Sequence, residues 1–159
     1  YIKKVRRISL KSHELSEDLN VSNTLIQCVR ILSNSADQKR SIDEILQIIC
    51  EFYQAQRCYV LDLDMDNKKT NGIYEYGKQY DDIHVENMVR LCLEHMDLVN
   101  QFFENQKSYY IDDVTNEISV TSPIYSSFIQ QKIHSIIVVP FMDDKQINGV
   151  FAVDNPKQN

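Results

Sequence analysis

The amino-acid sequence predicts an α+β fold in which helices pack on an antiparallel sheet, and three observations lead to this class. First, two apolar runs, Ser135–Phe141 and Asn148–Pro156, flank a polar turn and predict a closing β-hairpin. Second, the alternating run Arg57–Leu63 and the run Thr70–Tyr76 flank the turn Asp64–Lys68 and predict another hairpin. Third, helical patterns precede and separate these hairpins, which favours an antiparallel sheet over a parallel one.

The first 33 residues are expected to be mainly helical, because apolar residues recur there every three or four positions. This seam is close to a heptad repeat, which suits packing on the domain or on a second copy of the chain. Weak helix formers at Asn20–Asn23 indicate a break within the helix. The seam residues expected to form the dimer and signalling contact are Leu15, Leu19, Leu25, Val29 and Leu32.

A second helix is expected to begin at Ser41, because Ser41 and Glu44 have the spacing of a capping box. Apolar residues from Ile42 to Tyr53 then fall on one side of that helix. It leads directly into the strand predicted at Arg57–Leu63.

The middle of the chain carries two competing patterns. Residues 85–99 fit a helical stripe, whereas residues 89–94 alternate as a strand would. We expect a short strand near 88–94, followed by a helix from Asp97 to about Asn105. Beyond it, Tyr109–Ile111 is expected to be a strand and residues 114–121 a loop. Ser122 and Pro123 then suit a helix start, so the sheet should contain about six strands.

Composition excludes several classes of function. The 159 residues suit one domain. There is no signal-peptide pattern, and Tyr1 stands where an initiator Met would be, so the chain is expected to be a piece of a longer protein. Basic residues concentrate in the first eleven positions and the net charge is −6, so the body is acidic and no nucleic-acid partner is expected. No apolar run approaches the ~20 residues of a membrane span. With three glycines, no phosphate-binding glycine motif can be written.

Three stretches, taken in order, give a resemblance to a known family. Glu51–Val60 resembles the helix-to-strand junction found in members of that family. Tyr74–Tyr76 resembles the second strand of the family, in which an aromatic-Glu-aromatic triplet often occurs. Ile133–Pro140 and Asn148–Pro156 resemble a closing hairpin. Together these stretches resemble the GAF domain, a small cytoplasmic sensor module of signalling proteins. The first two are most similar to GAF domains attached to bacterial diguanylate cyclases.

The resemblance implies a GAF-like, PAS-like sheet with the long N-terminal helices on one face and short helices and loops on the other. It also implies that residues 1–21 are a linker or signalling helix, that residues 22–156 are the sensor domain, and that residues 157–159 begin a connection to an output domain. A place in cyclic-di-GMP signalling and a cytoplasmic location, either free or as the cytoplasmic part of a membrane-attached protein, are expected on the same grounds. Homodimerisation is expected from the apolar seam of the N-terminal helix. No enzymatic activity is expected within the chain itself.

By family geometry, a small-molecule pocket would lie between the sheet and the variable middle segments. Aromatic side chains with hydroxyl groups suit a pocket that is largely apolar with a few polar anchors. The candidate ligand-binding residues are Tyr59, Tyr74, Tyr76, Tyr110, Asp112, Tyr125, Phe128 and Ile129. The identity of the ligand stays open at this point.

No cofactor is assigned by the sequence. The Cys-His dipeptide that bilin-binding GAF domains commonly carry is absent, and Cys92 with His95 is one pair of ligand types rather than a haem or metal site. The cyclic-GMP signature of phosphodiesterase GAF domains cannot be traced. The function expected is therefore a non-catalytic sensory domain that binds an unidentified small molecule, dimerises, or does both. Two alternatives stay open, namely a dimerisation module without a ligand and a GAF-type free methionine sulfoxide reductase, although the cysteines are not clustered.

Overall fold

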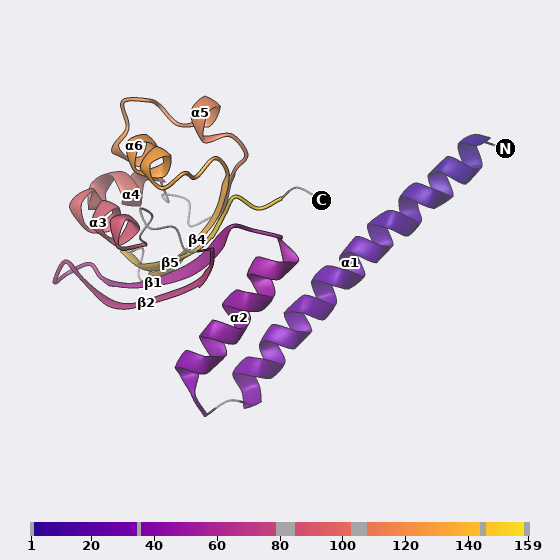
Figure 1. Cartoon of the computed structure of the whole chain (residues 1–159), viewed down its shortest axis with the longest axis horizontal. Helices are drawn as coiled ribbons and strands as arrows, with labels where there is room; N and C mark the ends of the chain where they lie inside the picture. Colours follow the sequence, from indigo (N-terminus) through magenta and orange to yellow (C-terminus); the bar gives the residue numbers. More distant parts are fainter. Residues whose placement is uncertain (1, 35, 79–84, 103–107, 144–145, 158–159) are drawn as a thin grey trace.

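A five-stranded antiparallel sheet forms the centre of the molecule, with helices on both of its faces (Figure 1). The strand order is β2-β1-β5-β4-β3. The computed structural model describes residues 2–34, 36–78, 85–102, 108–143 and 146–157. The strands are β1 (Arg57–Asp64), β2 (Lys69–Gly77), β3 (Tyr109–Ile111), β4 (Ile136–Asp143) and β5 (Gln146–Asp154).

Both predicted hairpins are confirmed. Strand β1 pairs with β2 on one side and with β5, the central strand, on the other, and β5 in turn pairs with β4. Pro140 lies within β4, where a proline removes a backbone donor. Proline is tolerated there because β3 pairs only with Ile136–Val138 of β4. Among the described residues, no strand therefore pairs with the outer side of β4 at Pro140.

The side chains of β1 alternate between two apolar cores, as the sequence predicted. Tyr59, Leu61 and Leu63 belong to the larger core, which lies under the middle segments of the chain. Cys58 and Val60 belong to the smaller core, on the opposite face of the sheet. Each face of the sheet is therefore covered by a different set of helices.

The strand predicted near 88–94 is wrong, and the described residues form a sheet of five strands rather than about six. These residues lie in helix α3 (Glu86–Glu94), which is followed by α4 (Met96–Phe102). Helical spacing prevailed because Val85, Met88, Val89 and Cys92 bury one continuous side against the larger core. The end of the helix predicted to reach Asn105 falls outside the described residues.

The smaller core lies beneath α2 (Gln38–Phe52), which contacts β1 and β2. The capping box predicted at Ser41 is wrong, because α2 begins one turn earlier. Asp37 is the N-cap, and its side chain accepts a hydrogen bond from the backbone N–H of Arg40 at 3.1 Å. The Ser41 hydroxyl instead donates to the backbone carbonyl of Asp37 at 2.9 Å.

The first helix, α1 (Ile2–Asn34), continues across Asn20–Asn23 without the predicted break. Residues 20–23 are all exposed, and weak helix formers cost only a few tenths of a kcal/mol each at such positions. Figure 1 shows α1 running antiparallel beside α2 and projecting beyond it, away from the sheet. In the described part of the chain, α2 therefore covers this face directly, and α1 packs on α2.

The other face lies beneath α3, α4, α5 (Val114–Glu117) and α6 (Pro123–Gln130) (Figure 1). The loop predicted for 114–121 is wrong for residues 114–117, which form the single helical turn α5. The Asp113 side chain caps this turn by accepting a hydrogen bond from the Thr115 N–H at 2.9 Å. The start of α6 is confirmed, with the Ser122 side chain accepting from the Ile124 N–H at 3.2 Å. Among the described residues, no helix combines the length and apolarity that a membrane crossing requires.

Candidate functional site

A cavity of about 50 Å³ lies between the sheet and the helices α3, α4 and α6. Strands β1, β4 and β5 form its floor, and the three helices form its roof. All of its lining residues are buried except Leu91, which is half-buried. The lining residues are Tyr59, Leu61, Met88, Leu91, Cys92, Val99, Ile124, Phe128, Ile136, Val138, Val150 and Ala152.

The cavity is apolar and small. Pockets that hold drug-sized ligands or cofactors typically measure ~300–1,000 Å³, which is several times the volume found here. Burial raises the pKa of the Tyr59 phenol well above its ordinary value and raises the pKa of the Cys92 thiol to about 12. Both groups are therefore neutral at physiological pH, and the cavity presents no charge to an occupant.

The eight candidate ligand residues do not converge on this cavity. Tyr59 and Phe128 line it. Tyr125 is half-buried and packs against the same core without lining the cavity, while Ile129 is exposed on α6. Tyr74 packs against the smaller core on the opposite face of the sheet.

The remaining three candidates are exposed. Tyr76 lies on β2, and Tyr110 and Asp112 lie on and just after β3. The Tyr110 hydroxyl donates to Asp112 Oδ1 at 3.1 Å. Tyr110 also lines a surface groove of about 360 Å³ between α1, the end of α2 and the C-terminal segment at Pro156.

Several cavity residues were missed as site candidates by sequence reasoning. Met88, Leu91 and Cys92 come from α3, and Val99 comes from α4. Their signal was present in the helical spacing of residues 85–99, but the competing alternation of residues 89–94 obscured it. A strand at these positions would lie within the sheet, whereas the helix that forms there supplies the roof of the cavity.

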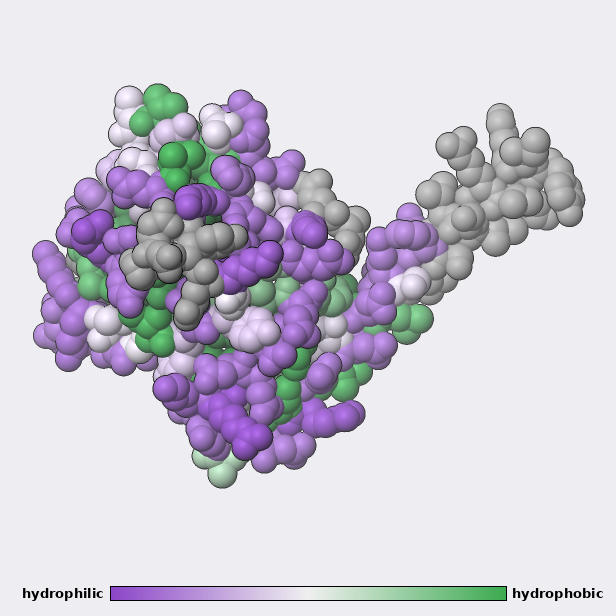
Figure 2. Space-filling view, viewed as in Figure 1, coloured by the Kyte–Doolittle hydropathy of each residue, from purple (hydrophilic) through white to green (hydrophobic). Residues whose placement is uncertain are grey.

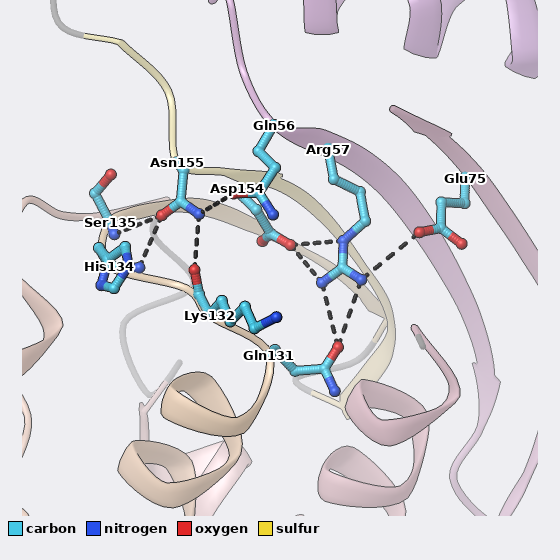
Figure 3. A network of polar contacts seen from close by, with 9 residues as sticks. All are labelled: Gln56, Arg57, Glu75, Gln131, Lys132, His134, Ser135, Asp154 and Asn155. Atoms are coloured by element: carbon cyan, nitrogen blue, oxygen red, sulfur yellow. Dashed lines mark hydrogen bonds and ion pairs between the residues drawn. The ribbon is translucent and has the colours of Figure 1, made fainter. Parts of the chain in front are cut away.

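A network of buried polar groups lies next to the cavity (Figure 3). Arg57 Nε donates to Asp154 Oδ2 at 2.8 Å, and Arg57 Nη2 contacts the same oxygen. Both side chains are almost completely buried, at 3% and 2% exposure. The guanidinium also lies 5.1 Å from the centre of the Tyr59 ring, so the network contacts a side chain that lines the cavity.

Two further side chains share the guanidinium of Arg57. Glu75 Oε1 lies 3.6 Å from Nη1, and Gln131 Oε1 accepts from Nη1 and Nη2 at 3.4 and 3.5 Å. Gln131 follows α6, whereas Asp154 ends β5. The network therefore ties the roof of the cavity to the strand by which the chain leaves the sheet. Burial raises the pKa of Asp154 to about 6, against the opposing effect of Arg57.

Asn155 fixes the same exit point through four hydrogen bonds (Figure 3). Its Oδ1 accepts from the backbone N–H groups of His134 and Ser135 at 2.7 and 3.1 Å. Its Nδ2 donates to Gln56 Oε1 at 2.7 Å and to the Lys132 carbonyl at 2.9 Å. The backbone at Asn155 has φ 50°, a left-handed conformation that asparagine tolerates better than most residues.

An exposed apolar stripe runs along α1, and we call it the α1 stripe. Its members are more than half exposed although they are large and apolar, at 56–61%. Figure 2 shows apolar side chains following the course of this helix. Leu15 belongs to the same helix, but its side chain is outside the described part of the structure. The stripe consists of Leu19, Leu25, Ile26, Val29 and Leu32.

The opposite side of α1 makes the contact with α2. Thr24, Cys28 and Ile31 are half-buried there, at the helical spacing that places them on one side. Consequently, Leu25, Val29 and Leu32 are turned away from α2 by about a quarter of a turn or more. The residues predicted as a seam are thus not used to pack α1 onto its own domain.

All four cysteines are free thiols. Burial raises the pKa of Cys28, Cys50, Cys58 and Cys92 above their ordinary values. Among the described residues, no group of three or more His, Cys, Asp or Glu side chains is arranged to hold a metal ion.

Comparisons with known proteins agree with this architecture. A free methionine-R-sulfoxide reductase from Neisseria meningitidis, solved with its substrate, is 15% identical with a TM-score of 0.53, over 83% of this chain and 71% of that chain. The far-red absorbing dark state of JSC1_58120g3 with bound biliverdin IXα is 12% identical with a TM-score of 0.60, over 86% of each chain. These likenesses concern the fold.

The GAF domain of a phosphoenolpyruvate-protein phosphotransferase from Coxiella burnetii is 11% identical, with a TM-score of 0.58 over 87% of this chain and 79% of that chain. No curated protein sequence matches the chain. The family model described as GAF domain matches residues 35–159. With a matching model over most of its length and a sheet of the same architecture, the chain belongs to the GAF domain family, a regulatory and sensory fold.

Proposed function

We propose that this GAF domain is a non-catalytic regulatory module that forms a homodimer through α1 and controls an output domain in the same protein. The observation that carries the proposal is the α1 stripe. Apolar side chains at this density and exposure on one helix are typical of an interaction surface. Their spacing of three and four residues suits a helix-to-helix seam.

A second copy of the chain is the partner that best fits the stripe. Only part of α1 lies beside α2, and the rest projects away from the domain (Figure 1). The α1 stripe lies on the part of the helix that runs beside α2, on the side turned away from α2. Helices draw most of their stability from packing, so pairing with a twin would bury a surface that α2 leaves exposed. Pairing would also place the two GAF domains side by side.

The size of the cavity supports regulation without a ligand of nucleotide size. At about 50 Å³, the interior holds no such molecule. The free methionine sulfoxide reductase reading is disfavoured because burial raises the pKa of all four thiols, whereas a nucleophilic cysteine needs a lowered pKa.

The output we infer is cyclic-di-GMP synthesis or turnover. Its support is the similarity of Glu51–Val60 and Tyr74–Tyr76 to GAF domains attached to diguanylate cyclases. An output domain of this kind would respond to a change in how the two α1 helices pair. A bias of a few kcal/mol between two arrangements of the helix pair is enough to shift the population from one arrangement to the other.

Sedimentation equilibrium tests the dimer. The wild-type chain is expected to approach the mass of two chains as its concentration rises, whereas Leu25→Glu/Val29→Glu should keep the mass of one chain. Charges placed in an apolar seam lose their hydration without gaining partners, so association should weaken at least a hundredfold. A matched control is Asn23→Glu/Gln27→Glu, which adds the same charge to exposed positions on another side of α1. Retention of the dimer by the stripe variant would exclude the stripe from the interface.

A further inference from the structure

The polar network at the end of β5 has an unbalanced charge (Figure 3). It holds one guanidinium, that of Arg57, and two carboxylates, those of Asp154 and Glu75, which both form ion pairs with it. When both carboxylates are ionised, the network carries one negative charge in excess. A charge that is buried without a partner is costly, so the network favours the uptake of one proton.

Burial decides which carboxylate takes that proton. The side chain of Asp154 is 2% exposed, whereas that of Glu75 is 26% exposed and keeps part of its hydration. Asp154 Oδ2 contacts Arg57 twice, while Oδ1 is buried and has no hydrogen-bond partner among the described residues. A proton on Oδ1 therefore neutralises the more costly charge and leaves the contacts of Oδ2 in place.

Other titratable side chains near Asp154 are buried and stay neutral. Burial raises the pKa of each of them, so they keep their protons at physiological pH. They are Tyr59 and Cys58 on β1 and Cys50 on α2. Lys132 and His134 lie next to Asn155, and their backbone groups bond to its side chain (Figure 3). Within the network itself, the carboxylates therefore set the charge.

We propose that this network is a proton-controlled latch on the end of β5. A proton on Asp154 balances the buried charge and holds residues 154–157 against the domain, and loss of that proton favours their release into water. The inference goes beyond the dimerisation proposed above and does not depend on it.

Backbone hydrogen bonds mark the closed latch and provide its readout. They join residues 154–157 to the junction between α2 and β1 and to the start of β4. The N–H of Gln56 donates to the carbonyl of Asp154 at 3.0 Å, that of Asn155 to Ser135 at 2.8 Å and that of Lys157 to Tyr53 at 3.0 Å. Release of the segment would expose these three amides to exchange with water.

The direction of the effect follows from proton linkage. In the closed latch the pKa of Asp154 is about 6, whereas a released and hydrated carboxyl has the ordinary value of 3.8. The closed form therefore binds the proton more tightly, and opening becomes easier as the pH rises from about 4 to about 6. Across this window, the equilibrium constant for opening should increase roughly a hundredfold.

Amide hydrogen exchange of the wild-type chain, followed by NMR from pH 4 to pH 7.5, tests the latch. After correction for intrinsic exchange rates, protection of the Gln56, Asn155 and Lys157 amides should fall roughly a hundredfold as the Asp154 carboxyl titrates. Low concentrations of urea should leave this protection almost unchanged, because a local opening exposes little surface. Exchange of these amides only through global unfolding, or protection that does not follow Asp154, would refute the latch.

Matched variants separate the latch from other effects of pH. Asp154→Asn should remove the pH dependence at the three amides, whereas Asp43→Asn, at an exposed position of α2, should keep it. Persistence of the pH dependence in Asp154→Asn would assign it to another group, such as His134, and overturn the proposal.

Glu75→Gln tests the charge balance without altering Asp154. It removes the excess negative charge, so the midpoint of the exchange profile should move to lower pH. An unchanged midpoint would contradict the proposal even if Asp154→Asn failed to fold. The Leu25→Glu/Val29→Glu variant should show the same profile as the wild type, so failure of the latch and failure of the dimer are distinguishable.

Discussion

At the scale of single residues, the buried pair of Arg57 and Asp154 is the most consequential feature. Removing two charges from water is expensive, and two contacts of Arg57 to one carboxylate oxygen of Asp154, with the flanking Glu75 and Gln131 around the guanidinium, offset only part of that cost, because the pKa of Asp154 stays raised. Such a pair fixes geometry more than it adds stability. It holds the end of β5 against the start of β1 and the end of α6.

Asp154 gives the stability of the domain a distinctive pH dependence. Its pKa is about 6 in the folded state, compared with 3.8 as its ordinary value. The folded chain therefore binds this proton more tightly than the unfolded chain does, and the free energy of unfolding falls as the pH rises from about 4 to about 6. We expect this contribution to amount to roughly 3 kcal/mol.

Urea unfolding of the wild type and of Asp154→Asn between pH 4 and pH 7.5 measures the effect. Other titrating groups act alike in both proteins, so the difference between the two free energies isolates Asp154. That difference should change by a few kcal/mol across the window, in the direction of a wild type that loses stability as pH rises. Parallel curves would show that Asp154 keeps its ordinary pKa.

At the scale of elements, the approach of β1 to β5 depends on Gly149. A Cβ atom at this position would lie 2.3 Å from the Leu61 carbonyl oxygen, which belongs to the backbone and has no room to move. Gly149→Ala is therefore expected to lower the free energy of unfolding by ~2 kcal/mol or more.

Gly72 on β2 provides the matched control for that substitution. A Cβ there would lie 3.1 Å from a ring atom of Tyr74, a side chain that can shift. Gly72→Ala should change the free energy of unfolding by less than ~1 kcal/mol. Equal losses in the two variants, measured by urea unfolding, would contradict the importance of the β1–β5 contact.

Much of this element order could be predicted from sequence because the signals are local. The hairpins have β-branched runs around polar turns, and Ser122 with Pro123 is a strong helix start. Residues 88–94 were misassigned because two periodicities coexist there, and only burial against the sheet decides between them. The start of α2 was predicted one turn too late for a similar reason, because Asp37 and Ser41 are both residue types that favour an N-cap.

The candidate site was harder to predict because it depends on register. Tyr74 pairs with Val60 and Tyr76 pairs with Cys58, and directly opposed residues of an antiparallel pair share a face. Both tyrosines therefore lie on the face opposite to that of Tyr59, although all three were expected in one pocket. The burial of Arg57 has no sequence signal at all, because an arginine in a strand is usually exposed.

At the scale of the whole molecule, the chain is layered. The middle helices cover one face of the sheet, α2 covers the other, and α1 lies outside α2 with its stripe exposed (Figure 1). The buried polar network and Asn155 hold the C-terminal exit of β5 between these layers. If α1 pairs as proposed, a change in that pairing would reach the exit of β5 through α2, because the Lys157 N–H donates to the carbonyl of Tyr53 at the end of α2.

Contact between the α1 stripes of two copies is the claim on which the proposed function rests, and isotope-filtered NOE spectroscopy tests it most directly. In a sample mixed from labelled and unlabelled chains, the account predicts cross-peaks between protomers from the methyl groups of Leu25, Val29 and Leu32. These cross-peaks should disappear in Leu25→Glu/Val29→Glu. A dimer that shows no filtered cross-peaks from these methyl groups, or a chain that stays monomeric at NMR concentration, would contradict the account.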